Sequence, residues 1–418
     1  MRSRPSLLFL SGLFPLPVSS GVQQRTMHLL ASLSRHFDVT LLTHAAQAGY
    51  EPHLPHLRQI CTRVLTVVPA NKRSALHRFA YKTLFWTRAV LQCESSDRFY
   101  NTVPNVTRAV ERELQAKRYD VLYCMYWYWP QAVLRASALR VLDSNDVQTE
   151  RYRNELEHTR QPLLRLLRSR LLRAYERQER SALQSMHLVV AVTERDRELL
   201  AHMAAGTDVV VVPTGLDTEH FSPRASIPQG AHLVFYGAMA NPMNRDAVHH
   251  FVQEILPRIR ARGLDVRVSL VGSSPSTDIV ALAERDPQIE VTGFVDDVRE
   301  PLASATLVVC PLRFGSGIRG RLYEVMSLAV PVVATPVAVR GMGLRDGDGV
   351  VVAESPEPFA AAVARLLQDG NERARLGARG RAYVVEHMSI AATFGRLAHD
   401  LVERVRHRGG EAPHREML

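Results

Sequence analysis

Apolar and polar positions alternate along most of the chain with two different periods. Short apolar segments rich in β-branched residues predict strands, and segments whose apolar residues recur every three or four positions predict helices. In the first half, the predicted strands span residues 6–11, 38–43, 64–68, 119–125, 140–142, 187–193 and 209–213. The predicted helices there span residues 22–35, 76–91, 105–117, 163–183 and 194–204. Strands that alternate with helices indicate a parallel sheet covered on both faces.

The pattern stops after Pro213 and restarts near His232. Residues 214–230 contain Pro, Gly, Ser and charge but little apolar periodicity, which is typical of a linker. Predicted strands then span 232–237, 266–271, 289–292, 305–309, 331–335 and 349–352. Predicted helices span 245–261, 279–285, 298–304, 356–367 and 372–386; another carries Arg319, Arg321 and Glu324, and a last one begins after Met388. Ligands of two such doubly wound α/β halves bind at the carboxyl ends of strands, so a cleft between the halves is the expected site.

The most informative stretch is residues 310–336, CPLRFGSGIRGRLYEVMSLAVPVVATP. It predicts a buried strand, a glycine-rich loop, a helix and a second buried strand. Glycines allow a close approach of backbone to ligand, and free N–H groups at a helix start attract an anion. Arg319 and Arg321 would add charged contacts to phosphate, and Glu324 could accept the hydroxyls of a ribose. The pattern favours a bound nucleotide diphosphate, and the alternative is a packing unit whose glycines only form a turn.

Composition narrows the class of protein. The chain has 418 residues, 46% of them apolar and 22% charged, which is ordinary for a globular protein. The four cysteines are scattered, with no disulfide framework or zinc motif, so we expect a reducing cytoplasm. The formal charge of +10 fits nucleic acid, an anionic membrane or a phosphorylated substrate, but no nucleic-acid-binding motif accompanies it, so we expect no nucleic acid. The apolar start is broken by Pro15 and Pro17, which favours a buried strand over a signal peptide.

One predicted helical segment is both basic and amphipathic. Within residues 161–175, four apolar side chains share one face and four arginines lie mostly around the other. This pattern fits peripheral contact with an anionic membrane surface. An ordinary surface helix of the N-terminal half is the alternative.

Four motifs in order resemble family-4 retaining glycosyltransferases of the GT-B fold. Residues 212–221 (VPTGLDTEHF) are similar to the family's interdomain segment, and residues 235–239 (FYGAM) to the opening of its donor domain. Residues 291–297 (VTGFVDD) are similar to its segment near the base, and residues 310–336 to its donor loop and helix. The Gly-Ser-Gly loop resembles that of the subset with exopolysaccharide-type sugar transferases. The resemblance covers nearly the whole chain.

The resemblance implies a division of the chain. It implies two Rossmann-like α/β domains that face each other across a cleft. We expect an acceptor-side domain at 1–213, a linker at 214–230 and a donor-binding domain at 231–387. A C-terminal helix at about 388–408 should cross back to the first domain, and 409–418 should form a disordered tail.

The resemblance also implies roles for particular residues. Those predicted to bind the donor are Gly21, Gly237, Asn244, Gly315, Ser316, Gly317, Arg319, Arg321 and Glu324. Ser316 replaces the first of two glutamates found in many members, and the usual Gly-Arg…Lys pair is absent after Gly237. We therefore expect Arg319 and Arg321 to take the diphosphate and to be catalytic. No cofactor and no metal are expected.

The acceptor side is predicted from the first domain. Many members have a histidine after the fourth strand, and this chain has aromatic residues there instead. We expect Asp143, Asp146 and Tyr126 on the acceptor side and Asp146 also as a catalytic residue. Helix capping is the alternative for Asp146, and core packing is the alternative for Tyr126.

Three functions fit the sequence. The first is retaining transfer of a sugar from a UDP- or GDP-sugar to a glycan or lipid-linked acceptor in cell-surface polysaccharide synthesis. The second is another GT-B activity, either glycosylation of a small natural product or epimerisation of a sugar nucleotide. The third is a non-catalytic sugar-nucleotide binder. The sequence also predicts a cytoplasmic protein, peripheral at the inner membrane face if the basic helix makes contact.

Overall fold

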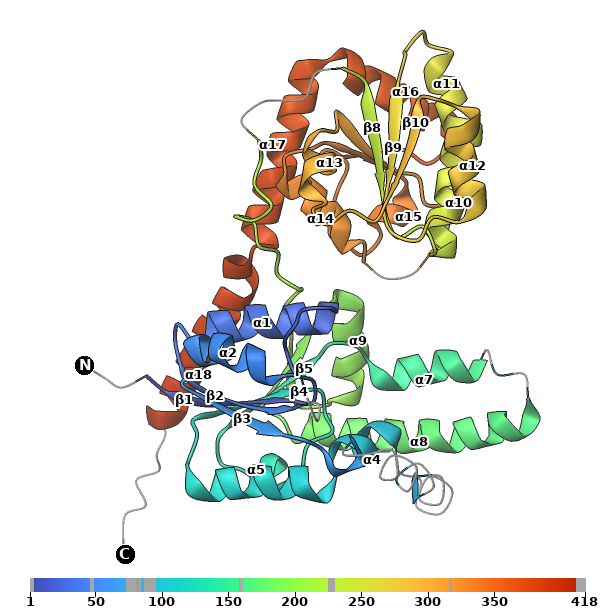
Figure 1. Ribbon diagram of the computed structural model, residues 1–418. Coiled ribbons are helices and arrows are strands. Elements are labelled where there is room, and N and C mark those ends of the chain that lie inside the picture. The colour runs from blue at the N-terminus through green and yellow to red at the C-terminus, as the bar shows by residue number, and fades with distance from the viewer. Residues whose placement is uncertain are drawn as a thin grey trace, which may run out of the picture. The chain divides into compact units, whose positions relative to one another are not determined.

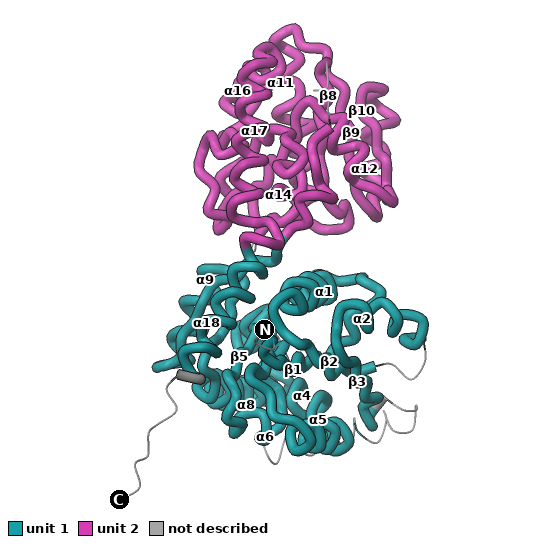
Figure 2. Tube along the Cα trace, turned by 90° about the vertical axis from the view of Figure 1, so that its left-hand side faces the viewer, with its two compact units in different colours: residues 1–215, 393–418 teal, residues 216–392 magenta. Residues whose placement is uncertain are grey.

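The computed structural model divides the chain into two compact units. It describes residues 4–45, 49–72, 81, 84–85, 95–157, 159, 161–224, 230–315 and 318–410. Unit 1 consists of residues 1–215 and 393–418, and unit 2 of residues 216–392 (Figure 2). The chain therefore passes between the units twice, near residue 215 and again near residue 392.

Unit 1 is built on a parallel sheet with helices on both sides (Figure 1). Its described strands pair in the order β3-β2-β1-β4-β5-β6-β7. Their bounds are β1 Ser6–Ser11, β2 Asp38–His44, β3 Arg63–Val67, β4 Val121–Met125, β5 Leu139–Ser144, β6 Leu188–Ala191 and β7 Asp208–Val211. The central strands are buried along almost their whole length because helices cover both faces, which is why they read as continuous apolar runs.

The helices of unit 1 include several that the apolar pattern did not predict. Their bounds are α1 Gly21–Leu33, α2 Leu54–Ile60, α4 Ser96–Asn101, α5 Pro104–Ala116, α6 Gln131–Leu134, α7 Gln148–Glu157, α8 Pro162–Gln184, α9 Glu194–Met203 and α18 Arg396–Gly410. Most of the helix predicted at 76–91 lies outside the described residues. Helix α7 was missed because its sequence is polar almost throughout, so it has no apolar period to recognise.

A buried carboxylate from α8 holds the start of α7. Glu179 Oε1 accepts from the backbone N–H of Gln148 at 3.1 Å, and Oε2 accepts from the N–H of Thr149 at 2.8 Å. These amides belong to the first turn of α7, where no intrahelical acceptor exists. Glu179 lies 30 residues further along the chain and is fully buried. The helix is therefore stabilised by a tertiary contact that local sequence does not reveal.

Unit 2 repeats the architecture of unit 1. Its described strands pair in parallel in the order β10-β9-β8-β11-β12-β13. They are β8 His232–Tyr236, β9 Arg267–Val271, β10 Ile289–Gly293, β11 Leu307–Cys310, β12 Val332–Ala334 and β13 Val350–Val352. The helices are α10 Pro242–His250, α11 Leu256–Arg260, α12 Thr277–Arg285, α13 Arg299–Ala303, α14 Gly320–Ser327, α15 Pro336–Val339, α16 Pro356–Gln368 and α17 Gly370–His387. A π-helical turn, Phe251–Ile255, joins α10 to α11, so the predicted helix at 245–261 is one interrupted rod.

The segment that begins unit 2 is fixed to that unit by backbone contacts. Leu216 forms an isolated parallel bridge with Ser389, and its N–H donates to the carbonyl of Met388 at 2.7 Å. Arg381 of α17 donates to the carbonyls of Thr218 and Phe221, both at 2.8 Å. Much of the predicted linker at 214–230 is thus held by unit 2, while residues 225–229 lie outside the described residues.

The end of the chain differs in part from the predicted tail. Helix α18 of unit 1 continues to Gly410, so residues 409 and 410, predicted as disordered, have helical backbone. Residues 411–418 lie outside the described residues.

Candidate functional site

A pocket in unit 2 lies where its strand order reverses. From β8 the sheet extends to β10 on one side, and β11 to β13 extend on the other. Such a switch point leaves a crevice at the carboxyl ends of the two central strands. A pocket of about 440 Å³ lies there. Its wall is formed by residues that end β8 and β11 or begin α10 and α14: Phe235, Tyr236, Gly237, Ala238, Asn241, Met243, Asn244, Cys310, Leu312, Ile318, Arg319, Gly320, Arg321, Leu322 and Glu324.

Many of the residues predicted to bind the donor meet in this pocket. Those that line it are Gly237, Asn244, Arg319, Arg321 and Glu324. Gly315 directly precedes the undescribed part of the loop, because Ser316 and Gly317 lie outside the described residues. The described part of the predicted donor site is therefore assembled from segments almost 90 positions apart in sequence.

Arg319 stands at the entry of α14. It occupies the N-cap position and is half-buried, and Gly320 begins the helix. A Cβ at Gly315 would lie 2.5 Å from Nη2 of Arg319, and the φ of Gly315 is +131°, so only glycine suits this position. The first amides of α14 have no acceptor within the helix. The guanidinium and these amides together form a positive region at the start of α14.

Arg321 and Glu324 are joined by a tyrosine that we did not predict as a site residue. The guanidinium carbon of Arg321 lies 5.1 Å from the centre of the Tyr236 ring, which is cation–π geometry. The Tyr236 hydroxyl donates to Oε2 of Glu324 at 3.0 Å. Tyr236 ends β8 within the motif FYGAM, of which only Gly237 was assigned a role. The available signal was a polar aromatic residue in the last position of a buried strand.

Burial raises the pKa values of both Glu324 and Tyr236. It raises the pKa of the Glu324 carboxyl, and the Tyr236 hydroxyl bond and the Arg321 charge partly oppose that shift. The pKa of Tyr236 is also raised, chiefly by burial and then by the neighbouring Glu324 charge. A carboxylate that has lost water is a strong acceptor for ligand hydroxyls. The pair Tyr236–Glu324 is thus suited to hold a diol.

The neighbouring Asn244 shapes the loop after β8. Its amide nitrogen donates to the carbonyl of Ala238 at 2.9 Å. A Cβ at Gly237 would lie 2.7 Å from that nitrogen, so a side chain at residue 237 would displace the Asn244 amide. Asn241 caps α10 by accepting from the N–H of Met243. Asn244 therefore lies in the wall of the pocket and fixes the loop after β8 through its hydrogen bond to Ala238.

In unit 1 the corresponding strand reversal lies between β1 and β4. Gly21 begins α1 after β1, with Ser20 as the N-cap. A Cβ at Gly21 would meet no atom within 4 Å, so neither packing nor backbone conformation requires glycine there. Tyr126 follows β4 with a left-handed φ of 65°, an uncommon conformation that costs free energy for a residue with a side chain. Its ring stacks on Tyr128 at 5.5 Å. Both positions are at the edge of the sheet where a ligand would bind.

The prediction for Asp143 is wrong in its geometry. Asp143 is fully buried, and its two oxygens accept from Nε and Nη2 of Arg25 at 3.1 and 2.9 Å. The Tyr123 hydroxyl donates to Oδ2 at 2.6 Å. The carboxylate is therefore occupied inside unit 1 and is not presented to an acceptor. The sequence placed Asp143 after a predicted strand at 140–142, but it lies within β5, with its side chain directed into the core.

Asp146 lies in a polar group that the sequence did not reveal. Its Oδ1 accepts from Nε2 of Gln148 at 2.6 Å, while Glu179 holds the first amides of α7, so helix capping by Asp146 is not observed. Burial raises the pKa of Asp146, and the Arg151 charge opposes this shift. The pKa of Asp97 is raised for the same reason, and Nη2 of Arg151 lies 3.3 Å from Oδ2 of Asp97. Asp97 and Arg151 had no recognisable motif.

The described residues contain no cluster of metal-ligating side chains. Within the described ranges, no group of three or more His, Cys, Asp or Glu side chains could hold a metal ion. Burial raises the pKa of the Cys310 thiol to about 12, against the lowering effect of the Arg319 charge, so this thiol beside the pocket is neutral. The charged side chains that line the pocket are Arg319, Arg321 and Glu324.

Two family models match the chain. Residues 19–220 match the model described as Glycosyltransferase Family 4, and residues 230–369 match the model described as Glycosyl transferases group 1. Among curated proteins, no sequence matches this chain significantly.

Solved structures agree on the fold. HepE of Anabaena in complex with UDP is 14% identical, with a TM-score of 0.57, over 95% of this chain and 100% of that one. Sucrose-phosphate synthase of Thermosynechococcus elongatus is 16% identical, with a TM-score of 0.58, over 96% and 100%. WaaG, a glycosyltransferase involved in lipopolysaccharide biosynthesis, is 16% identical, with a TM-score of 0.55, over 94% and 99%. The predicted GT-B fold of two Rossmann-like domains is confirmed.

The chain therefore has the GT-B fold, with a pocket at the strand-order reversal of its second unit. The two family models further indicate a glycosyltransferase of the family-4 type.

Proposed function

We propose that this protein transfers a sugar, with retention of configuration, from a UDP- or GDP-sugar to a glycan or lipid-linked acceptor of a cell-surface polysaccharide. The observation that carries the proposal is the pocket at the β8/β11 switch point, where a helix start, two arginines and a half-buried glutamate meet. HepE, a structural neighbour, was solved with UDP, with UDP and glucose, and with UDP-glucose. WaaG, another neighbour, acts in lipopolysaccharide biosynthesis.

In this proposal the diphosphate lies at the start of α14. Arg319, Arg321 and the first amides of the helix stabilise the negative charge that grows on the leaving diphosphate as the glycosidic bond breaks. Glu324, positioned by Tyr236, accepts the ribose hydroxyls. The acceptor hydroxyl attacks from the face that the leaving group departs, and the leaving phosphate receives its proton. Fixed positive groups perform the task that a metal ion performs in other transferases.

The acceptor is proposed to bind at the carboxyl edge of the unit 1 sheet. The open space at Gly21, the left-handed Tyr126 and the half-buried Asp146 support this assignment. Asp97 and Arg151 extend the group, because their charges face Asp146 and Tyr126. An aromatic ring and paired carboxylates are chemically suited to a sugar, which offers an apolar face and several hydroxyls.

The test is a transfer assay on the purified protein with UDP- and GDP-sugars. The donor is first chosen by screening nucleotide sugars for a rise in Tm, since a ligand that binds the folded state stabilises it. Arg321→Ala should then slow transfer by about 2–4 kcal/mol in activation free energy. Arg285→Ala, which removes an exposed arginine at the end of α12 outside the pocket, is the matched control and should behave as the wild type.

Three outcomes would contradict the proposal. Conversion of the nucleotide sugar without an acceptor would indicate an epimerase. Binding without release of UDP or GDP in the presence of acceptor extracts would indicate a non-catalytic binder. Wild-type kinetics in Arg321→Ala would remove the donor-site assignment.

We further propose that α8 brings the enzyme to an anionic membrane. The exposed residues on one side of this helix are Arg165, Leu166, Arg170, Arg173, Arg177 and Arg180, and Leu166 has 56% of its surface exposed. This row is about 23 Å long at the usual helical rise. Arginines near an anionic surface contribute about 1 kcal/mol each, so the row could hold the protein reversibly. No helix of the described residues combines the length and apolarity needed to cross a membrane.

Vesicle sedimentation tests this membrane contact. The protein should sediment with vesicles of mixed phosphatidylglycerol and phosphatidylcholine and not with phosphatidylcholine alone. The triple variant R165E/R170E/R173E should remain in the supernatant. Equal sedimentation of that variant would restore the alternative of an ordinary surface helix.

A further inference from the structure

A second, smaller pocket of unit 2 lies at the opposite edge of the sheet from the donor pocket. It has a volume of about 140 Å³. Ala305 and Thr306 directly precede β11, and Pro331 directly precedes β12, so the pocket adjoins the amino ends of these strands. Residues 328–330, which follow α14, form another part of the wall. Helix α14 therefore begins at the donor pocket and ends at this pocket.

A buried arginine lines the pocket, and part of its hydrogen-bonding capacity is unused. Arg373 of α17 has only 8% of its surface exposed and lines the pocket. Its Nη1 donates to the carbonyls of Leu366 and Leu367, at 2.7 and 2.8 Å, and so caps the end of α16. Nε is buried without a hydrogen-bond partner, and no described residue accepts from Nη2. Nε and Nη2 form the edge of the guanidinium that binds a carboxylate or phosphate in bidentate fashion.

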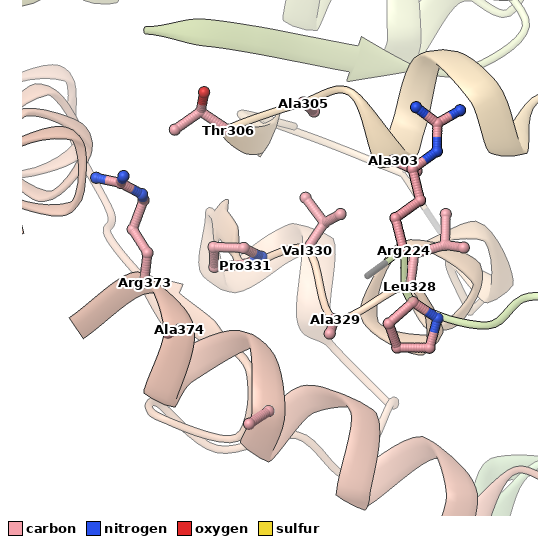
Figure 3. A pocket seen from close by; sticks show the side chains of 12 residues that line it. Arg224, Ala303, Ala305, Thr306, Leu328, Ala329, Val330, Pro331, Arg373 and Ala374 are labelled. Carbon is pink, nitrogen blue, oxygen red and sulfur yellow. The ribbon is translucent and has the colours of Figure 1, made fainter. Parts of the chain in front are cut away.

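Arg373 has no carboxylate partner among the described residues. None of the ion pairs between described residues includes Arg373 or Arg224. Figure 3 shows Arg373 and Arg224 on opposite sides of the pocket, with small apolar side chains between them. A buried charge without a counter-ion is costly, and an anion would remove that cost. The two carbonyls at the end of α16 compensate the charge only in part, and an anion in the pocket would compensate the rest.

We propose that this pocket binds a small oxyanion against the guanidinium of Arg373, with the exposed Arg224 as the second cation. A cavity of about 150 Å³ can hold a molecule the size of benzene, so the volume admits phosphate or a short carboxylic acid. The apolar wall formed by Ala303, Leu328, Val330 and Pro331 suits the hydrocarbon part of such an acid. The site differs from the donor pocket in its residues and in the edge of the sheet it occupies, and it does not depend on the proposed transfer activity.

Calorimetric titration of the full-length protein with inorganic phosphate, and separately with isobutyrate, tests the site at constant ionic strength. Saturable binding of either probe is expected. Phosphate binding alone would identify a free phosphate site, and isobutyrate binding alone a carboxylate site. Arg224→Ala should weaken binding several-fold, and Arg373→Lys at least tenfold. The lysine keeps the charge and a donor for the α16 carbonyls but lacks the forked edge.

Two further variants make the test specific. Ala374→Leu should fill the pocket from α17 and abolish binding while both arginines remain. Arg375→Ala removes a neighbouring exposed charge that does not line the pocket and should bind as the wild type. Binding should also persist in Arg321→Ala, which excludes the donor pocket as the source. Unsaturable heats, or full affinity in Ala374→Leu, would overturn the proposal.

Discussion

The buried pair Arg25–Asp143 provides the sharpest test of how unit 1 is held together. Arg25 has 1% and Asp143 0% of its side chain exposed, and their closest atoms are 2.9 Å apart. Asp143→Ala would remove the acceptor of two hydrogen bonds from Arg25 and one from Tyr123. It would leave the arginine charge buried, with the carbonyl of Val212 at 2.9 Å as its acceptor.

The magnitude follows from these contacts. Breaking a buried ion pair by removing one partner costs about 3–5 kcal/mol. Leaving the Tyr123 hydroxyl without a partner costs about 1–3 kcal/mol. The two losses share one carboxylate and do not add fully, so we expect unit 1 to lose at least about 3 kcal/mol. That is a large fraction of the about 5–15 kcal/mol by which domains are usually stable.

Urea unfolding followed by tryptophan fluorescence measures this loss. All three tryptophans, at positions 86, 127 and 129, belong to unit 1, so the signal reports on that unit. Asp143→Ala should move the midpoint to lower urea. The double variant R25M/D143L should recover much of the loss, because apolar residues of similar size tolerate such a site. Tyr123→Phe is the control: it removes only the hydrogen bond from the Tyr123 hydroxyl to Asp143 and should move the midpoint less.

The opposite result would refute the reasoning. If Asp143→Ala unfolds at the wild-type urea concentration but loses transfer activity, then Asp143 acts on the acceptor and the buried pair is not a structural element. If R25M/D143L does not recover stability, the fold requires the ion pair itself, and apolar residues cannot replace it.

Three further predictions concern the donor pocket. Because burial raises the pKa of Glu324 above its ordinary value of 4.5, ionisation of this carboxyl opposes folding above the raised pKa and has no effect well below 4.5. Glu324→Gln should therefore have a higher Tm than the wild type near pH 8 but not near pH 4, and equal Tm values at both would contradict the shift. Tyr236→Phe should weaken the affinity for the nucleoside diphosphate and displace its acidic limb to higher pH, as followed by calorimetry, whereas Tyr323→Phe, whose hydroxyl binds the Met342 carbonyl, should do neither. Transfer activity should survive EDTA, and loss that Mg²⁺ or Mn²⁺ restores would show that a metal ligand was overlooked.

The sequence predicted the parts of the fold that rest on periodic burial. Strands such as β1 and β11 are buried on both faces, and their continuous apolar runs marked them. Helix α7 escaped because Glu179, a residue 30 positions away, supplies its cap. The apolar pattern of a segment predicts which of its residues are buried. A hydrogen bond between residues far apart in the chain has no signal in the local sequence.

The candidate site shows the same division. Arg319, Arg321 and Glu324 were recognised because they occur in one contiguous stretch around a glycine loop. Tyr236 comes from a strand 88 residues from Glu324, and only the folded sheet brings the two together. Asp143 was misplaced because the predicted strand ended at residue 142, whereas β5 continues to Ser144 and both of its faces are covered. Arg373 belongs to no sequence motif. Its unpaired Nε and its place in the pocket are visible only in the folded structure.

The two crossings of the chain have a consequence for how the protein is made. Unit 2 is continuous, from residue 216 to residue 392, so it can complete its sheet as soon as it leaves the ribosome. Unit 1 emerges first but lacks α18, whose Leu397, Ala398 and Leu401 are buried, until the residues beyond 392 have been made. Phe394, which the Arg25 guanidinium faces at 5.1 Å, arrives equally late. Unit 1 therefore stays incompletely covered until α18 has been synthesised, and a nascent chain stalled before residue 393 would expose apolar surface to chaperones and proteases.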